Sequence, residues 1–216
     1  MKETFVVGNF KSNSPTGSID EWIKQVLSES GKPNVTIIVC PDFTLLPQFS
    51  SLVIGSKIKL GAQNISPFEE GAHTGEINGA QIKKFADYVI IGHSERRREF
   101  NETDDELRKK VVMAKKYDLV PIYCIQDEDT FVPESVNIVA YEPPSAIGSG
   151  NPDTPENANK VIKTVKEEYG VVKALYGGSV TPENVGSFLQ MPDIDGVLVG
   201  GASLDPQKFV AIIKNA

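Results

Sequence analysis

Five polar side chains that suit acid–base chemistry stand directly after short apolar runs of the chain. Asn9 and Lys11 follow the first run, His93 and Glu95 follow the fourth, and Glu142 follows the sixth. A carboxylate and a neutral imidazole together suit removal of a proton from a carbon next to a carbonyl, because one group takes the proton while the other polarises the oxygen. Lys11 adds a fixed cation, and we expect it to pair with Glu95. These residue types therefore predict proton-transfer chemistry without a metal.

Glycine-rich segments follow the sixth, seventh and eighth runs, at residues 146–150, 177–179 and 200–203. Glycine lets backbone N–H groups approach an anion closely, so these segments predict a phosphate site. A single glycine pair would be an ordinary turn into a helix, but its recurrence in consecutive units favours binding. The segment after Glu142 begins with two prolines and ends with glycine, which is typical of a lid with one rigid and one flexible end.

Other polar residues have simpler interpretations. His73 lies in a polar loop without chemical neighbours, and we expect it to be structural. Arg96, Arg97 and Arg98 are expected to be charges at the surface or at a helix terminus.

The candidate residues stand at the ends of eight apolar runs spread along the chain. The runs lie at residues 4–8, 35–40, 59–62, 88–92, 120–125, 137–141, 173–176 and 196–200. Near-continuous apolar runs are typical of parallel strands buried on both faces. Between them, an amphipathic repeat over residues 19–27 follows a capping box at Ser18 and Glu21, and Thr103 and Glu106 repeat that box. Thr-Pro or Asp-Pro pairs predict three further helix starts, at residues 154–155, 181–182 and 205–206.

Strands that alternate with helices along the whole chain predict an α/β fold with a parallel sheet. Eight strand–helix steps favour closure into a (β/α)8 barrel over the main alternative, a doubly wound open sheet. No linker-like segment interrupts the pattern, so residues 1–216 are expected to form a single domain. Catalytic groups of such barrels stand at the C-terminal ends of the strands. The fifth crossover, residues 126–136, has room for only a helical turn or two, which predicts a shortened fifth βα unit.

Composition excludes several classes of protein. The 216 residues carry a formal net charge of −7, which argues against nucleic acid or an anionic membrane as a partner. No stretch approaches the ~20 apolar residues of a membrane span, and no signal peptide is evident at the start. Cys40 and Cys124 are far apart, each ending an apolar run, so we expect free buried thiols in the cytoplasm. No histidine or cysteine has a spacing typical of metal ligands, and no cofactor is expected.

Motifs along nearly the whole chain resemble the triose-phosphate isomerase family. Each is weak alone, but their order, each after its own strand, is specific. The motifs are Gly8-Asn9-Phe10-Lys11, Gly61-Ala62-Gln63-Asn64, Gly71-Ala72-His73-Thr74-Gly75-Glu76, Ile91-Gly92-His93-Ser94-Glu95-Arg96-Arg97, Ala140-Tyr141-Glu142-Pro143, Ala146-Ile147-Gly148-Ser149-Gly150, Tyr176-Gly177-Gly178-Ser179-Val180 and Gly196-Val197-Leu198-Val199-Gly200-Gly201-Ala202-Ser203-Leu204.

The resemblance implies interconversion of dihydroxyacetone phosphate and D-glyceraldehyde 3-phosphate through an enediolate, as in glycolysis and gluconeogenesis. Glu142 would be the base, and His93, as a neutral imidazole, would polarise the carbonyl. Lys11 would stabilise the negative charge, Asn9 would hydrogen-bond a substrate oxygen, and Glu95 would orient Lys11. This scheme of a Glu base, a neutral His and a closing loop is the family's own and is carried over through the resemblance. The phosphate would be held by backbone N–H groups of Gly148, Ser179, Gly200 and Gly201.

The chain departs from the family pattern in its lid and in its fifth unit. Pro144-Ser145 stands where most bacterial and eukaryotic members have a small apolar residue and a tryptophan, and the Pro-Pro pair resembles archaeal members. The seventh loop looks bacterial, whereas the shortened fifth helix and the short chain resemble archaeal relatives. The resemblance also implies a homodimer through the loop from Gln63 to Glu76, with Thr74 reaching a neighbouring site. A tetramer, as in short archaeal members, stays open.

Two rival functions share the phosphate site. One is a phosphate-binding barrel of another reaction type, such as a Schiff-base aldolase or an indole-forming lyase. Strands four to seven offer no lysine for a Schiff base except Lys173 at a strand entry. The other is a barrel that binds a phosphorylated ligand without turnover, and retention of Asn9, Lys11, His93 and Glu142 speaks against it, because a pure binder needs no base.

Overall fold

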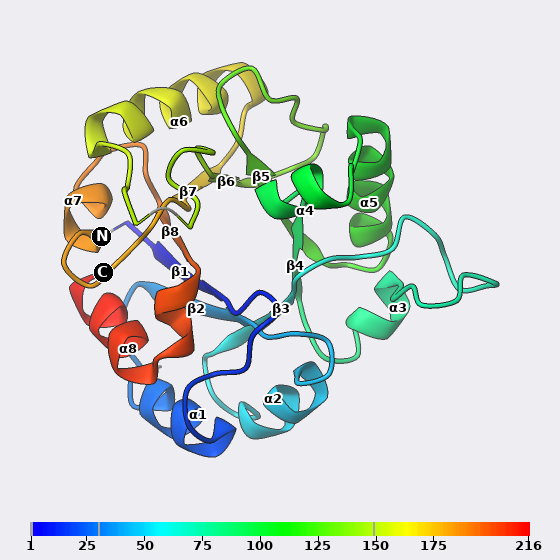
Figure 1. The fold of residues 1–216 in the computed structure, drawn as a ribbon, viewed down its shortest axis with the longest axis horizontal. Coiled ribbons are helices and arrows are strands. Elements are labelled where there is room, and N and C mark those ends of the chain that lie inside the picture. The colour runs from blue at the N-terminus through cyan, green and yellow to red at the C-terminus, as the bar shows by residue number, and fades with distance from the viewer. Residues whose placement is uncertain (1, 30, 149) are drawn as a thin grey trace.

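The computed structural model describes residues 2–29, 31–148 and 150–216, so Met1 and the lid residue Ser149 lie outside the described residues. Eight parallel strands form a closed barrel in chain order (Figure 1). Strand β8 pairs with β1, with Val7 beside Leu198, which closes the sheet and rules out the doubly wound alternative. The strands are β1 (Thr4–Asn9), β2 (Val35–Cys40), β3 (Lys59–Ala62), β4 (Tyr88–Ile91), β5 (Val120–Ile125), β6 (Ile138–Tyr141), β7 (Lys173–Tyr176) and β8 (Gly196–Val199).

Helices surround the barrel as an outer ring (Figure 1). Those of the described residues are α1 (Ile19–Leu27), α2 (Leu46–Leu52), α3 (Gly79–Ile82), α4 (Ser94–Glu99), α5 (Asp104–Lys116), α6 (Pro155–Tyr169), α7 (Val185–Leu189), the 3-10 helix η1 (Gly201–Leu204) and α8 (Pro206–Asn215). None of them combines the length and the apolar character that crossing a membrane requires.

Most predicted helix starts are confirmed by their caps. Ser18, Thr103 and Thr154 each accept a hydrogen bond from the backbone N–H three residues ahead, and Asp205 caps α8. The start predicted at residues 181–182 is wrong, because α7 begins only at Val185. There the Asn184 side chain accepts the N–H of Thr181 at 2.8 Å, which stabilises a turn before the helix.

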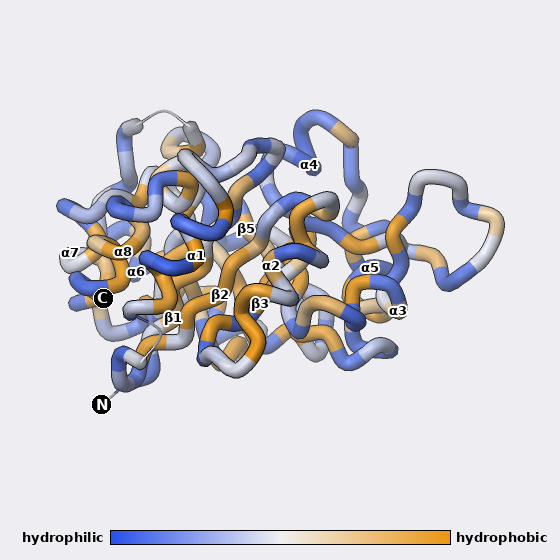
Figure 2. Tube along the Cα trace, turned by 90° about the horizontal axis from the view of Figure 1, so that it is seen from below, coloured by the Kyte–Doolittle hydropathy of each residue, from blue (hydrophilic) through white to orange (hydrophobic). Residues whose placement is uncertain are grey.

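Apolar side chains fill two layers. One layer lies inside the barrel and includes Val7, Ile38, Ile90 and Leu198, and the other lies between the strands and the helices. Figure 2 shows the strands as the apolar centre, with hydrophilic segments outside. Such burial on both faces explains why the strands read as continuous apolar runs. The buried thiols of Cys40 and Cys124 are free, as predicted.

The fifth βα unit is shortened even more than predicted. Residues 126–137 connect β5 to β6 with turns and no helix. Val132 and Val136 are buried and take the place of a helix against the barrel, while the ring of Phe131 lies under the guanidinium of Arg108. The shortening therefore leaves the strand pairing of β5 and β6 intact, from Ile122 beside Ile138 onward.

The segment between β3 and α3 projects away from the barrel (Figures 1 and 2). In this segment the rings of Phe68 and His73 stack with centroids 4.2 Å apart. This contact agrees with the expected structural role of His73. Thr74 is exposed in the same segment, and Phe68 keeps 48% of its surface exposed.

Candidate active site

Glu142 directly follows β6 and points into the barrel mouth. Its backbone N–H donates to the Ile125 carbonyl at 2.8 Å, which continues the strand pairing and fixes its position. Only 1% of the residue is exposed. One carboxylate oxygen lies 2.9 Å from Nε2 of His93, and the other accepts the backbone N–H of Ser94 at 3.0 Å.

His93 follows β4 and caps the N-terminus of α4. Its Nδ1 accepts the backbone N–H of Glu95 at 3.2 Å. Because a backbone N–H can only donate, Nδ1 is the unprotonated nitrogen, and Nε2 of the neutral ring carries the proton toward Glu142. The neutral ring therefore presents an N–H donor to the cavity.

The two buried groups shift each other's protonation. For His93, burial is the largest single effect and lowers the pKa, but the charge and hydrogen bond of Glu142, together with the charge of Glu95, raise the pKa above 6.5. For Glu142, burial raises the pKa, and the His93 ring, the Ser94 N–H and Lys11 together hold it below 4.5. Glu142 is consequently ionised at neutral pH, as a base must be.

Lys11 stands opposite this pair after β1. Its Nζ lies 2.6 Å from Oε1 of Glu95, so the predicted ion pair is confirmed. The backbone of Lys11 has φ +53, in the left-handed region, and Oδ1 of Asn9 accepts the Lys11 N–H at 3.0 Å. Gln63 donates to the Lys11 carbonyl at 2.9 Å and to that of Cys40 at 2.9 Å. These bonds hold the strained turn that aims the lysine.

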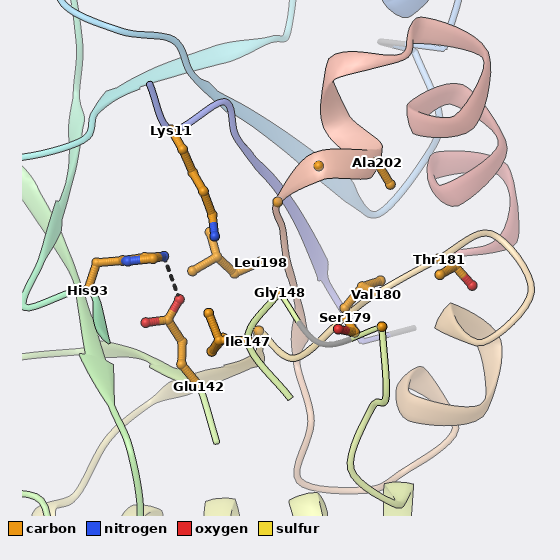
Figure 3. A pocket seen from close by; sticks show the side chains of 14 residues that line it. Lys11, His93, Glu142, Ile147, Gly148, Ser179, Val180, Thr181, Leu198 and Ala202 are labelled. Carbon is orange, nitrogen blue, oxygen red and sulfur yellow. Dashed lines mark ion pairs between the residues drawn. The ribbon is translucent and has the colours of Figure 1, made fainter. Parts of the chain in front are cut away.

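A cavity of about 240 Å³ joins these side chains to the glycine-rich loops. Lys11, His93 and Glu142 line one side, and Ser179 and Ala202 lie across from them (Figure 3). Gly148, Gly200 and Gly201, to which the resemblance assigns the phosphate, also line the cavity. Asn9 and Glu95 lie beside this cavity without lining it: Asn9 contacts Lys11, and Glu95 contacts both Lys11 and His93.

The loop after β7 is tied to the lid segment. Ser179 has φ +51, and its hydroxyl donates to the Ala146 carbonyl at 2.6 Å. The loop after β8 continues into η1, where the Ser203 carbonyl accepts the indole N–H of Trp22 at 3.0 Å. Both loops are thus fixed by contacts outside the cavity.

The structure adds three contributors that the sequence does not assign to this site. Gln63 belongs to one of the motifs but has no predicted role, and the Ser94 N–H that holds the base is invisible in a sequence. Arg97 lies in the last turn of α4, as one of the two expected positions has it, but its side chain is only 13% exposed and reaches the backbone before His93. An arginine in the short helix that follows His93 is the only sequence signal that points to it.

Among the described residues, no group of three or more His, Cys, Asp or Glu side chains is arranged to hold a metal ion. The arrangement instead combines an ionised carboxylate, an N–H donor and a cation around one cavity that ends in glycine-rich backbone. Such a set can remove a proton next to a carbonyl and stabilise the oxyanion that results.

Comparisons of the sequence with a family model and with known proteins all match triosephosphate isomerases. A family model described as triosephosphate isomerase matches residues 4–216. A triosephosphate isomerase of Alkaliphilus oremlandii is 39% identical over 246 aligned positions, covering 99% of both chains. One of Dictyoglomus turgidum is 36% identical over 249 positions and covers all of both chains, and one of Clostridium tetani is 37% identical over 99% of this chain and 96% of its own.

Proposed function

The chain belongs to the triosephosphate isomerase family and is an isomerase of triose phosphates, and we propose that Glu142, His93 and Lys11 carry out its proton transfers. The single observation that carries the assignment of the base is the ionised, buried Glu142 carboxylate 2.9 Å from the His93 ring, at the wall of a cavity. Dihydroxyacetone phosphate and D-glyceraldehyde 3-phosphate differ only in which carbon carries the carbonyl, so moving one proton between carbons and one between oxygens suffices for their interconversion.

In the first half of the reaction, Glu142 takes the proton from the carbon next to the carbonyl. The electron pair of the broken C–H bond forms the double bond of an enediolate, and negative charge moves to the carbonyl oxygen. His93 donates its Nε2–H toward that oxygen, and the ammonium of Lys11 stabilises the charge. In the second half, His93 moves the proton of the neighbouring hydroxyl to the former carbonyl oxygen, and Glu142 gives its proton to the former carbonyl carbon as the new carbonyl forms on the other carbon, so no external oxidant or reductant is needed.

The substrate must displace Glu142 from His93, because one N–H cannot donate fully to both the carboxylate and the substrate oxygen. Once the carboxylate turns to the substrate, the main cause that raises the pKa of His93 moves away. Burial and the Glu95 N–H on Nδ1 then favour the neutral imidazole. This release gives the ring the protonation state that the reaction requires.

Positioning groups complete the assignment. Glu95 holds Lys11 through the 2.6 Å ion pair. Oδ1 of Asn9 accepts the Lys11 N–H, so its side-chain amide N–H groups are the donors that would reach a substrate oxygen beside Lys11. The phosphate lies against Gly148, Ser179, Gly200 and Gly201, all of which line the cavity. The segment that begins at Pro143 closes over the substrate and excludes water.

The isomerase assignment is also favoured over the Schiff-base alternative. Lys173 begins β7 at the opposite end of the strand from the site and lies 3.9 Å from Asp195. Lys11 is the one lysine that lines the cavity in the part of the chain that the structure describes.

An isotope experiment tests the proton-transfer mechanism. Isomerisation in deuterated water, followed by proton NMR of the product, should place solvent deuterium on the carbon that receives the proton, because the Glu142 carboxyl exchanges with solvent between the two steps. The same measurement on Glu142→Gln assigns the base: a large loss of both turnover and deuterium incorporation is expected, and incorporation at the wild-type rate in this variant would refute Glu142 as the base.

For the assembly we propose a homodimer through the projecting loop from Gln63 to Glu76. Its exposed Phe68 and its projection from the barrel body support an intermolecular role (Figure 1). Light scattering of the wild type beside Thr74→Arg tests this proposal: the variant should shift toward monomers. A wild-type mass of one chain would contradict it, and a mass of four chains would show that a second surface is also used.

We also propose that residues 1–216 form one domain and that the protein works in the cytoplasm. Closure of all eight strands, from Thr4 to Val199, into one barrel supports the first proposal, and two buried free thiols are compatible with a reducing compartment.

A further inference from the structure

Arg97 differs from its neighbour Arg98 in α4 by turning its side chain into the protein. Its side chain is 13% exposed, against 64% for Arg98, which pairs with Glu99 at the surface. The guanidinium of Arg97 donates from Nε to the Gly92 carbonyl at 2.9 Å and from Nη2 to the Cys124 carbonyl at 3.2 Å. Nη2 also reaches the Tyr123 hydroxyl at 3.1 Å.

One carbonyl directly precedes His93, and the other belongs to the strand that pairs with the strand before Glu142. Gly92 directly precedes His93 and has φ +72, so it lies in the left-handed region and sets the direction in which the chain leaves β4. Cys124 lies in β5, and the carbonyl of the residue after it accepts the Glu142 N–H at 2.8 Å. Arg97 therefore contacts the end of the strand that precedes His93 and the end of the strand that lies between His93 and Glu142 in the barrel.

These contacts lie just past the last backbone pair between β4 and β5. The register of β4 with β5 ends at Ile91 beside Tyr123. Beyond that point, the side chain of Arg97 spans the gap between Gly92 and Cys124. The guanidinium also lies over the Tyr123 ring, 5.5 Å from its centroid, and donates from Nη1 to Asp104 at 3.1 Å. Acceptors on several sides thus hold the planar group in one orientation.

We propose that Arg97 is a positioning residue for the isomerisation: it fixes the ends of β4 and β5 so that His93 and Glu142 meet the substrate at the distance that proton transfer requires. The inference rests on the proposed roles of His93 and Glu142. Arg97 acts through the backbone and does not line the cavity. A lysine is a poor substitute, because an ammonium is a single point charge and cannot span two carbonyls as the planar five-donor guanidinium does.

The phosphate end of the cavity does not depend on the contacts that Arg97 makes with Gly92 and Cys124. It is formed by loops after β6, β7 and β8, and the Ser179 hydroxyl is held by the Ala146 carbonyl rather than by α4. Loss of Arg97 should therefore impair chemistry and leave phosphate binding nearly unchanged. A purely structural role would instead lower stability and leave the turnover of the folded fraction intact.

The test compares kcat, KM, inhibition by inorganic phosphate and the thermal midpoint for wild type, Arg97→Met, Arg97→Lys and Arg98→Met. We expect kcat of Arg97→Met to fall on the order of 10²-fold, since a misplacement of about 1 Å costs that much. Arg97→Lys should recover part of the loss, and Arg98→Met should match wild type. KM and phosphate inhibition should change much less than kcat in every folded variant.

Tyr123→Phe is a second variant that keeps the ring and removes only the hydroxyl acceptor. It should retain most of kcat, because both carbonyl bonds remain, and a large loss of kcat in this variant would contradict the proposal even if Arg97→Met does not fold. Unchanged kcat per folded molecule in Arg97→Lys and Arg97→Met would overturn the proposal, as would equal losses in kcat and phosphate affinity. An inactive wild type would instead refute the proposed function, whatever the Arg97 variants do.

Discussion

Gly177 follows β7 and lies beside the Glu142 carboxylate, the proposed base, so a single added methyl group there should perturb that base directly. A Cβ at this position would lie 3.0 Å from Cγ of Glu142, 3.3 Å from the Tyr141 carbonyl oxygen and 3.5 Å from Cβ of Leu198. The backbone of Gly177 is outside the left-handed region, so alanine adds no backbone strain. The contact with Glu142 is therefore the main consequence of Gly177→Ala.

The magnitude follows from ordinary contact distances. Carbon atoms rest at about 3.5–4.0 Å, so Cγ of Glu142 must retreat by roughly 0.5–1 Å. The Tyr141 carbonyl is strand backbone and cannot move as easily, which leaves the carboxylate side chain to yield. A displacement of that size predicts a fall in kcat of roughly 10- to 100-fold with KM nearly unchanged. Overpacking should also cost about 1–3 kcal/mol of stability.

Steady-state kinetics with D-glyceraldehyde 3-phosphate and thermal unfolding would measure both effects. Gly186→Ala is the matched control, because nothing lies within 4 Å of its added Cβ and it sits in α7. It should keep full kcat and gain about 0.5–1 kcal/mol of stability. The reasoning is refuted if Gly177→Ala keeps wild-type kcat while folded, since the clash would then not reach the base.

Three more predictions concern charge. Lys11→Met should lower kcat/KM by about 10²–10³-fold without loss of fold, and an active variant in steady-state assays would remove Lys11 from the mechanism. In Glu142→Gln the pKa of His93 should fall below its wild-type value, because the carboxylate that raises it is gone while burial remains; NMR titration measures this with His73 as internal control, and an unchanged pKa would contradict the pairing. The folded-state pKa of Glu142 is depressed, so its ionic contribution to stability is present above pH 4.5 and lost as the pH falls through the folded pKa. In chemical denaturation, the unfolding free energy of the wild type relative to Glu142→Gln should therefore decrease as the pH is lowered below 4.5. A difference that does not change with pH would contradict the depressed pKa of Glu142.

Much of the barrel can be predicted because its signals are local. Runs such as 35–40 and 120–125 match β2 and β5 to the residue, since strands buried on both faces must be apolar throughout. Caps such as Ser18 and Thr154 act within one helical turn, so they can also be identified from the sequence. The predicted start of α7 is misplaced because a competing side-chain bond, from the Thr181 N–H to Asn184, is equally local and the sequence does not show which one wins.

The sequence predicts which residue types form the candidate site, but it does not predict most of the hydrogen bonds that hold them in place. Lys11, His93 and Glu142 follow buried strands, and parallel closure brings strand ends together. The direction of Arg97 depends on carbonyls at the ends of two different strands, and the Gln63 bonds join backbone atoms 23 and 52 residues away. Such contacts are set by three-dimensional closure, which no short sequence window contains.

The most direct test of the account is a coupled assay of purified protein with D-glyceraldehyde 3-phosphate, wild type beside Glu142→Gln, with inorganic phosphate inhibition measured in parallel. We predict rapid conversion by the wild type and a loss of kcat of about 10²–10⁴-fold or more in the variant, with phosphate affinity retained. A folded, phosphate-binding wild type without turnover would contradict the account and would indicate a barrel that binds a phosphorylated ligand without acting on it.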